Sequence, residues 1–173
     1  MVYNATEVAK YVVNFSSQSG DRITQLKLQK ILYYIQGTYL ALKGCPAFSD
    51  EIMAWKLGPA VHSVYSAYKQ YDDQPIPPSD SDVNMEPEDQ LFIAEIYKKF
   101  RGFTAAQLVD KTHNEAPWRD TTTNDVISID SIRDFFANVV FNDDDLLSDK
   151  PIVTELPKEW YDPTENEEWR NYK

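Results

Sequence analysis

The segment from Thr24 to Gly44 constrains the fold more than any other part of the chain. The Thr24 hydroxyl can cap the start of a helix, and Gly44 followed by Pro46 can end it. Apolar residues recur between them at helical spacing and form a wide stripe: Leu26, Leu28, Ile31, Leu32, Ile35, Tyr39 and Leu42. The polar residues fall mostly on the other side, away from the stripe: Lys27, Gln29, Lys30, Gln36 and Lys43. This pattern predicts a long helix whose apolar face other elements must cover.

Shorter segments predict further helices around this one. They run from Thr6 to Val13 with Asn4 or Thr6 as cap, from Pro59 to near Tyr71, from Pro87 to Arg101, from Thr104 to Lys111, and onward from Asp130 or Ser131. Residues 50–55 are too short for a helix and predict one strand of a small hairpin, or an extended segment. Residues 72–86 are rich in proline and aspartate and predict an exposed loop.

Charge divides the chain near Asn142. Residues 142–173 hold ten acids and four bases, a balance of 4 − 10 = −6, and residues 1–141 hold the other eighteen acids and thirteen bases, 13 − 18 = −5. The later part also carries prolines that break regular structure: Pro151, Pro157 and Pro163. We therefore expect a mainly α, single-domain body over residues 1–141, with about six helices and room for one short β-hairpin, followed by an acidic tail over residues 142–173.

The total charge of −11 and the isoelectric point near 4.5 argue against a nucleic-acid binder and against docking on anionic lipid. A single cysteine, Cys45, excludes an internal disulfide and a cysteine-built zinc cluster, which fits a reducing cytoplasm. No stretch approaches the length of a membrane span, and the first residues carry no export signal. The expectation is a cytoplasmic protein without a membrane or direct nucleic-acid partner.

Catalytic side chains are scarce in the sequence. His62 and His113 are the only histidines, and neither belongs to a local metal-binding pair. A small hydrolase or metalloenzyme using both histidines and a carboxylate such as Asp120 stays open as an alternative. Our interpretation nevertheless assigns no catalytic, metal or cofactor-binding residue.

Three segments, taken in order, resemble motifs of the SocA-like, or Panacea, antitoxin domain. They are residues 26–37, residues 52–59 with Val64 and Tyr65 after them, and residues 112–118, and the resemblance covers roughly Ala5 to Phe141. Ala60 stands where that family usually has a valine. The residues that carry the match are Gln29, Lys30, Tyr33, Tyr34, Trp55, Gly58, Pro59, Tyr65, Thr112, His113, Pro117 and Trp118.

The resemblance implies a mainly helical bacterial or phage-borne protein that neutralises a cognate toxin by direct binding, and one family member is also a proteolytic adaptor. The family is not known for catalysis, so the motif residues transfer as determinants of the fold and as contact residues. An acidic body favours a basic toxin as partner. Candidate contact residues are Asp72, Asp73, Asp80, Asp82, Trp160, Tyr161 and Trp169. A further alternative is a phage or prophage protein that acts as an acidic mimic of nucleic acid.

Overall fold

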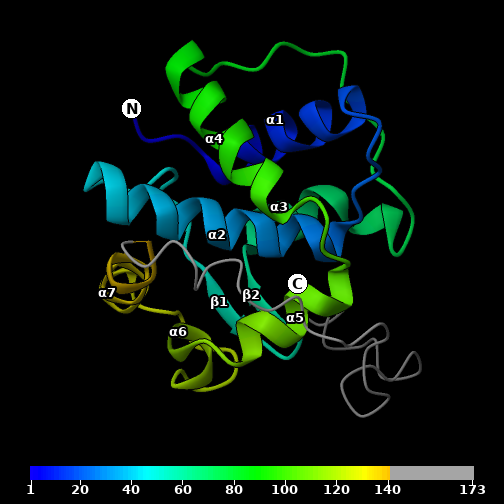
Figure 1. Cartoon of the computed structure of the whole chain (residues 1–173). Coiled ribbons are helices and arrows are strands. Elements are labelled where there is room, and N and C mark those ends of the chain that lie inside the picture. The colour runs from blue at the N-terminus through cyan, green and yellow to red at the C-terminus, as the bar shows by residue number, and fades with distance from the viewer. Residues whose placement is uncertain (141–173) are drawn as a thin grey trace.

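Helix α2, Gln25–Lys43, passes through the middle of the molecule, and the other elements pack around it (Figure 1). The computed structural model describes residues 1–140. Its remaining elements, in chain order, are α1 Ala5–Gln18, β1 Met53–Trp55, β2 Gly58–Ala60, α3 His62–Tyr68, the 3-10 helix η1 Lys69–Tyr71, α4 Pro87–Phe100, α5 Ala105–His113, α6 Ala116–Arg119 and α7 Ile129–Val140. The expected mainly α fold with one short hairpin is confirmed. The acidic tail, with Trp160, Tyr161 and Trp169, lies outside the described residues.

The predicted ends of α2 are confirmed by the backbone. Thr24 Oγ1 accepts a hydrogen bond from the Lys27 amide at 3.5 Å, and Gly44 closes the helix in the left-handed conformation, with φ of 68°. Every residue from Leu28 to Leu40 is buried, because α1, α4, α5, α7 and the hairpin contact different sides of the helix. A helix enclosed in this way has no extended polar face in its middle.

Two predicted helix starts also agree with the structure. Pro87 opens α4, and Thr104 caps α5 through a reciprocal pair of hydrogen bonds with Gln107. The position of α7 matches the segment predicted from Asp130 onward. The short α6 was not predicted, because four residues are too few to show a helical repeat.

Two sequence expectations are wrong in detail. Helix α1 continues beyond Val13, its predicted end, to Gln18, and the buried Ser16 hydroxyl donates to the Val13 carbonyl at 2.8 Å. Pro59 lies in strand β2, not in the first turn of α3, since it pairs with Ala54 across the hairpin.

Neither edge of the two-stranded antiparallel sheet is open, because other parts of the chain lie along both. Strand β1 exchanges backbone hydrogen bonds with the segment before α7: Ala54 N donates to the Asp125 carbonyl at 2.9 Å, and Asn124 N donates to the Ala54 carbonyl at 2.8 Å. Strand β2 lies against α2. The hairpin thereby ties α7 to the central helix.

Helix α7 packs closely on α2 through Gly37. A Cβ atom built on Gly37 would lie 2.3 Å from the Phe136 ring, so only glycine admits this approach. Phe136 is fully buried between Tyr33 and Tyr34, with ring centroids at 5.3 and 5.9 Å. Within residues 1–140, none of the helices combines the length and apolar character that a membrane crossing needs.

Candidate functional site

The three motif segments, far apart in sequence, meet along one side of α2. Gln29, Lys30, Tyr33 and Tyr34 come from α2, Trp55 from β1, and Gly58 and Pro59 from β2. Thr112 and His113 end α5, Pro117 and Trp118 lie in α6, and Tyr65 of α3 packs edge-on against Trp55 at 5.4 Å. Most of these side chains are buried, while His113 and Trp118 are half-buried. We refer to this group as the motif cluster.

Lys30 lies at the centre of the motif cluster. Its side chain is 0% exposed, and Nζ donates to the Pro59 carbonyl at 2.7 Å. No carboxylate forms a salt bridge with it among the described residues, and burial lowers the pKa of Lys30 to about 7. Burial removes most of the water around the Lys30 ammonium group, and its hydrogen bond to Pro59 connects the hairpin to the helix.

Gly58 supplies the space that this lysine occupies. Its φ of +99° is a conformation that side chains rarely adopt. An added Cβ atom would lie 2.8 Å from Thr112 Oγ1 and 2.9 Å from Lys30 Cε. Gly58 is therefore required both by its backbone angle and by close contact with two other motif segments.

The glutamines of α2 bind the backbone of flanking loops, although sequence reasoning placed them on the polar side of the helix. Gln29 Oε1 accepts from the Val61 amide at 2.7 Å, and Gln29 Nε2 donates to the Val61 carbonyl at 3.2 Å. Gln36 does the same further along, accepting from the Ala47 amide at 2.9 Å and donating to the Phe48 carbonyl at 2.9 Å. Gln29, Lys30 and Gln36 are thus buried connectors, which satisfy backbone groups that would otherwise lack partners.

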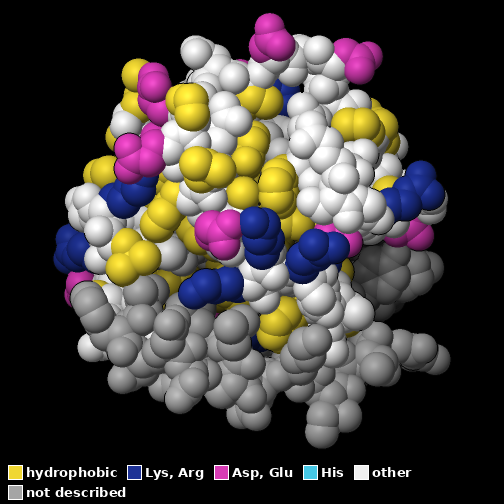
Figure 2. All heavy atoms as spheres, turned by 45° about the horizontal axis from the view of Figure 1, so that its top comes forward, with side chains coloured by type: hydrophobic (Ala, Val, Ile, Leu, Met, Phe, Trp, Pro, Cys, Tyr) yellow, Lys and Arg dark blue, Asp and Glu magenta, His cyan; other side chains and the backbone are white. Residues whose placement is uncertain are grey.

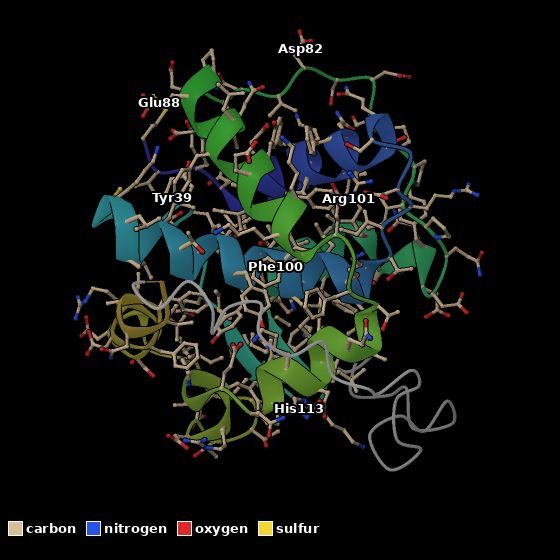
Figure 3. The ribbon with its side chains drawn as sticks, in the orientation of Figure 1. Tyr39, Asp82, Glu88, Phe100, Arg101 and His113 are labelled. Carbon is tan, nitrogen blue, oxygen red and sulfur yellow. The ribbon has the colours of Figure 1, made fainter. Side chains whose placement is uncertain are left out.

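The last motif segment stacks two aromatic side chains over the hairpin. The His113 and Trp118 rings are parallel, with centroids 3.8 Å apart, and Trp118 Nε1 donates to the Trp55 carbonyl at 2.8 Å. Burial, with a smaller contribution from the charge of Lys30, lowers the pKa of His113 to about 4. The imidazole is neutral at physiological pH, and Figure 3 places it at the C-terminal end of α5.

Glu115 is a member of the motif cluster that sequence reasoning did not single out. Tyr34 donates its hydroxyl proton to Glu115 Oε1 at 2.8 Å, and Lys111 Nζ lies 3.8 Å from the same oxygen. Burial raises the pKa of Glu115 to about 7, against the opposing effects of Lys111 and Tyr34. No local pattern indicated this carboxylate, because the predicted helix ends at Lys111 and Glu115 lies beyond it.

Asp89 is a second buried carboxylate, at the other end of α2. It accepts hydrogen bonds from Tyr3 at 2.6 Å and Lys43 at 2.7 Å, and so joins the N-terminal segment and α2 to α4. Burial alone would raise the pKa of Asp89, but the hydrogen bonds from Lys43 and Tyr3 lower it to about 2. Sequence reasoning placed Asp89 only within the helix predicted from Pro87 to Arg101.

The alternative of a metal or hydrolase site requires convergent ligands. His62 is exposed and meets Trp55 edge-on at 6.1 Å, whereas His113 is stacked on Trp118. Asp120 is exposed and paired with Arg119 at 2.8 Å. Among the residues that the structure describes, no three His, Cys, Asp or Glu side chains lie close enough together to hold a metal ion.

The acidic loop, residues 72–86, is fixed across α1. Asn14 Nδ2 donates to the Ser79 carbonyl at 3.1 Å, the Ser79 amide donates back to Asn14 Oδ1 at 2.8 Å, and Lys10 Nζ donates to the Asp82 carbonyl at 2.7 Å. A pocket of about 280 Å³ lies beneath it, lined partly by Tyr68 and Tyr71. The loop's four aspartates are exposed: Asp72, Asp73, Asp80 and Asp82. Figure 3 shows Asp82 at the outer edge of the molecule.

Comparison with known proteins identifies the protein family to which the chain belongs. The family model described as "Antitoxin SocA-like, Panacea domain" matches residues 28–119, which contain the whole motif cluster, and the chain belongs to this family. Antitoxin SocA of Caulobacter vibrioides (strain NA1000 / CB15N) is 34% identical over 65 residues, which cover 38% of this chain and 35% of that protein. The match thus spans about a third of the relative's length. No solved structure matches the chain.

Proposed function

We propose that this protein is an antitoxin that neutralises a cognate toxin by direct protein–protein binding. The observation that carries the proposal is the family match over residues 28–119, together with the similarity to a protein named Antitoxin SocA. Membership of an antitoxin family argues against an enzyme. In this proposal the antitoxin acts by binding its toxin and needs no cofactor. It works in the cytoplasm of a bacterium, as a bacterial or phage-encoded product.

The motif cluster supports a structural role for the family motif. The Lys30 and Trp118 side chains donate hydrogen bonds to the hairpin backbone, and Gln29 bonds the backbone of Val61 directly after it. Side chains that make these hydrogen bonds hold the helices and the hairpin in one arrangement. Partner contacts then fall to the residues that this scaffold presents at its surface.

The acidic loop is the surface that we propose for the toxin. It presents Asp80 and Asp82 close to the points where Asn14 and Lys10 hold its backbone, so little conformational entropy is lost when a partner binds. A body with a balance of −5 attracts a basic protein over distances near the Debye length, and the attraction weakens as salt rises. A basic toxin is therefore the expected partner.

Co-expression with the product of the neighbouring gene tests the proposal. We expect that product to arrest growth alone and to be harmless beside this protein, with the two purifying as a complex. A neighbour that is harmless by itself, or that stays toxic in the presence of this protein, contradicts the antitoxin role. Recovery of a DNA-binding regulator in place of a toxic enzyme would favour the nucleic-acid mimic.

A charge-reversal variant tests the surface separately. Asp80→Lys/Asp82→Lys is expected to weaken toxin binding by about tenfold or more, because it replaces attraction by repulsion at an exposed site. The matched control is Glu51→Lys/Asp134→Lys, which makes the same change of charge at exposed positions away from the loop. Equal weakening in both variants would show that total charge matters and the loop does not.

A further inference from the structure

The pocket beneath the acidic loop is lined by three stretches of the chain. Val13 comes from α1, Tyr68 and Tyr71 come from α3 and η1, and Pro77 and Pro78 come from the loop itself. Its volume of about 280 Å³ lies just below the range of roughly 300–1,000 Å³ that is typical of sites for small molecules. A pocket of this size suits one long side chain of a partner protein.

Tyr68 and Tyr71 form an aromatic wall of the pocket. Their ring centroids are 6.4 Å apart, the ring planes are tilted by 37°, and both side chains are half-buried. The face of a tyrosine ring carries partial negative charge and attracts a cation. Burial raises the pKa of Tyr68, and the charges of Tyr71 and Glu7 act in the same direction, so the negative potential of Glu7 extends to this wall.

Hydrogen-bond acceptors without partners lie beside the rings. Within residues 1–140, no group pairs with the side-chain amide of Gln70 or with the hydroxyls of Tyr68 and Tyr71. Lys10, a cation in the pocket wall, is already paired with Glu7 Oε1 at 3.1 Å. A cationic donor that enters the pocket therefore meets free acceptors and no uncompensated positive charge.

Negative charge surrounds the pocket. Residues 7–14 and 67–82, which contain its lining residues, carry five acids and two bases, 2 − 5 = −3. Asp72 and Asp73 follow Tyr71 directly and are exposed. Figure 2 shows acidic side chains at the upper edge of the molecule, the edge at which Figure 3 labels Asp82, and most lysines and arginines lower on the same face. The potential at the pocket therefore favours a cation.

We propose that this pocket receives an arginine side chain of the partner protein. A guanidinium group is planar and weakly hydrated, so it can stack on the tyrosine rings while its N–H groups bond to Gln70 and to the carboxylates at the rim. A lysine ammonium is compact and strongly hydrated and lacks the planar contact. Arginine side chains in pockets often carry much of the binding energy of an interface. The inference rests on the proposed role of the acidic loop as the surface that binds the toxin.

Two charge-matched peptides test the proposal without the toxin. Hexa-arginine and hexa-lysine carry the same charge, so a difference between their affinities reports the shape and stacking of the side chain. NMR titration of the isotope-labelled whole chain would follow the side-chain amide signals of Asn14 and Gln70, which both line the pocket. We expect the Kd for hexa-arginine at these signals to be about fivefold or more below that for hexa-lysine.

Ala67→Phe and Tyr71→Leu should each reduce this preference to about twofold or less. Ala67 is exposed and lines the pocket, so a phenylalanine there fills the space, whereas Tyr71→Leu keeps an apolar side chain and removes the ring. The matched control is Tyr11→Leu. Tyr11 is also half-buried but lies outside the pocket, stacked on Phe15, and its replacement should leave the preference unchanged.

Equal affinities for the two peptides in the wild-type chain would overturn the proposal, and so would an arginine preference that Ala67→Phe and Tyr71→Leu leave unchanged. Neither result bears on the antitoxin role. Tighter binding of hexa-proline at the same signals would also overturn the proposal and reassign the pocket to a proline-rich segment. A pocket-dependent arginine preference supports it even if the neighbouring gene product proves harmless, because neither peptide is a toxin.

Discussion

Lys30 and Gly58 lie in close contact where the central helix meets the hairpin: a Cβ atom on Gly58 would lie 2.9 Å from Lys30 Cε and 3.1 Å from Nζ. The lysine crosses the hairpin at this point to donate to the Pro59 carbonyl. Two of the family's motif segments are thus joined by the Lys30 side chain, which occupies space that any side chain at position 58 would fill.

Substitution of this glycine should therefore be costly. Gly58→Ala is expected to lower the free energy of unfolding by about 2–4 kcal/mol, through overpacking against Lys30 and Thr112 and through strain at positive φ. Chemical denaturation measured by circular dichroism would give the value.

Gly44→Ala is the matched control for Gly58→Ala. Gly44 also has a positive φ, of +68°, but nothing lies within 4 Å of its added Cβ atom, so about 1 kcal/mol is expected. Similar losses at the two positions would mean that backbone strain alone matters and that the close contact does not.

Titration of Lys30 should contribute to the pH dependence of the free energy of unfolding. Its pKa falls from 10.5 in the unfolded chain to about 7 in the folded protein, so the unfolded chain binds the extra proton between these values. Stability should then rise with pH over this range, with a slope of up to about 1.4 kcal/mol per pH unit from this group. Urea titrations between pH 7.5 and 9.5 would measure the slope.

Lys30→Met provides the comparison, because it keeps the aliphatic stem and removes the titrating group. We expect the slope to be flatter in Lys30→Met, whatever the change in absolute stability. Identical slopes in the two proteins would refute a desolvated lysine at this position.

Glu115 should act in the opposite sense at lower pH. Its pKa rises from 4.5 to about 7 on folding, so the folded protein keeps a proton that the unfolded chain loses. The stabilisation is complete below pH 4.5 and is lost as pH rises toward 7, again by up to about 1.4 kcal/mol per pH unit. Glu115→Gln keeps an acceptor for Tyr34 but cannot titrate.

Comparing Glu115→Gln with the wild type cancels the contributions of other groups in the same range. His113, with its pKa lowered to about 4, destabilises the protein as pH falls from 6.5, and this contribution is common to both chains. The difference in stability between them should therefore change between pH 4.5 and 7. A constant difference would count against a protonated Glu115.

Much of the fold could be predicted because its helices carry local signals. Thr24, Gly44, Pro87 and Thr104 act on backbone groups within a few residues, so the sequence around each is sufficient to place a helix end. Pro59 was misplaced because its fixed φ suits the first turn of a helix and a short strand alike.

The buried polar residues could not be placed by the same reasoning. Helical periodicity separates polar from apolar positions, but it does not show whether a polar side chain meets water or a distant backbone group. Gln29 and Lys30 bind residues 29 to 32 positions away in sequence, and Glu115 binds Tyr34 across 81 positions. Only the resemblance to a family indicated that residues in these segments belong together.

The covered hairpin has a consequence for how any partner can be held. Along one edge the backbone of β1 is hydrogen-bonded to residues 124 and 125, and along the other edge β2 lies against α2 and accepts a hydrogen bond from Lys30. A peptide cannot extend this sheet by adding a strand, since the positions it would need are taken. A partner must then be recognised by side chains on helix faces and loops. These surface side chains can differ between relatives without any change in the buried residues that support them.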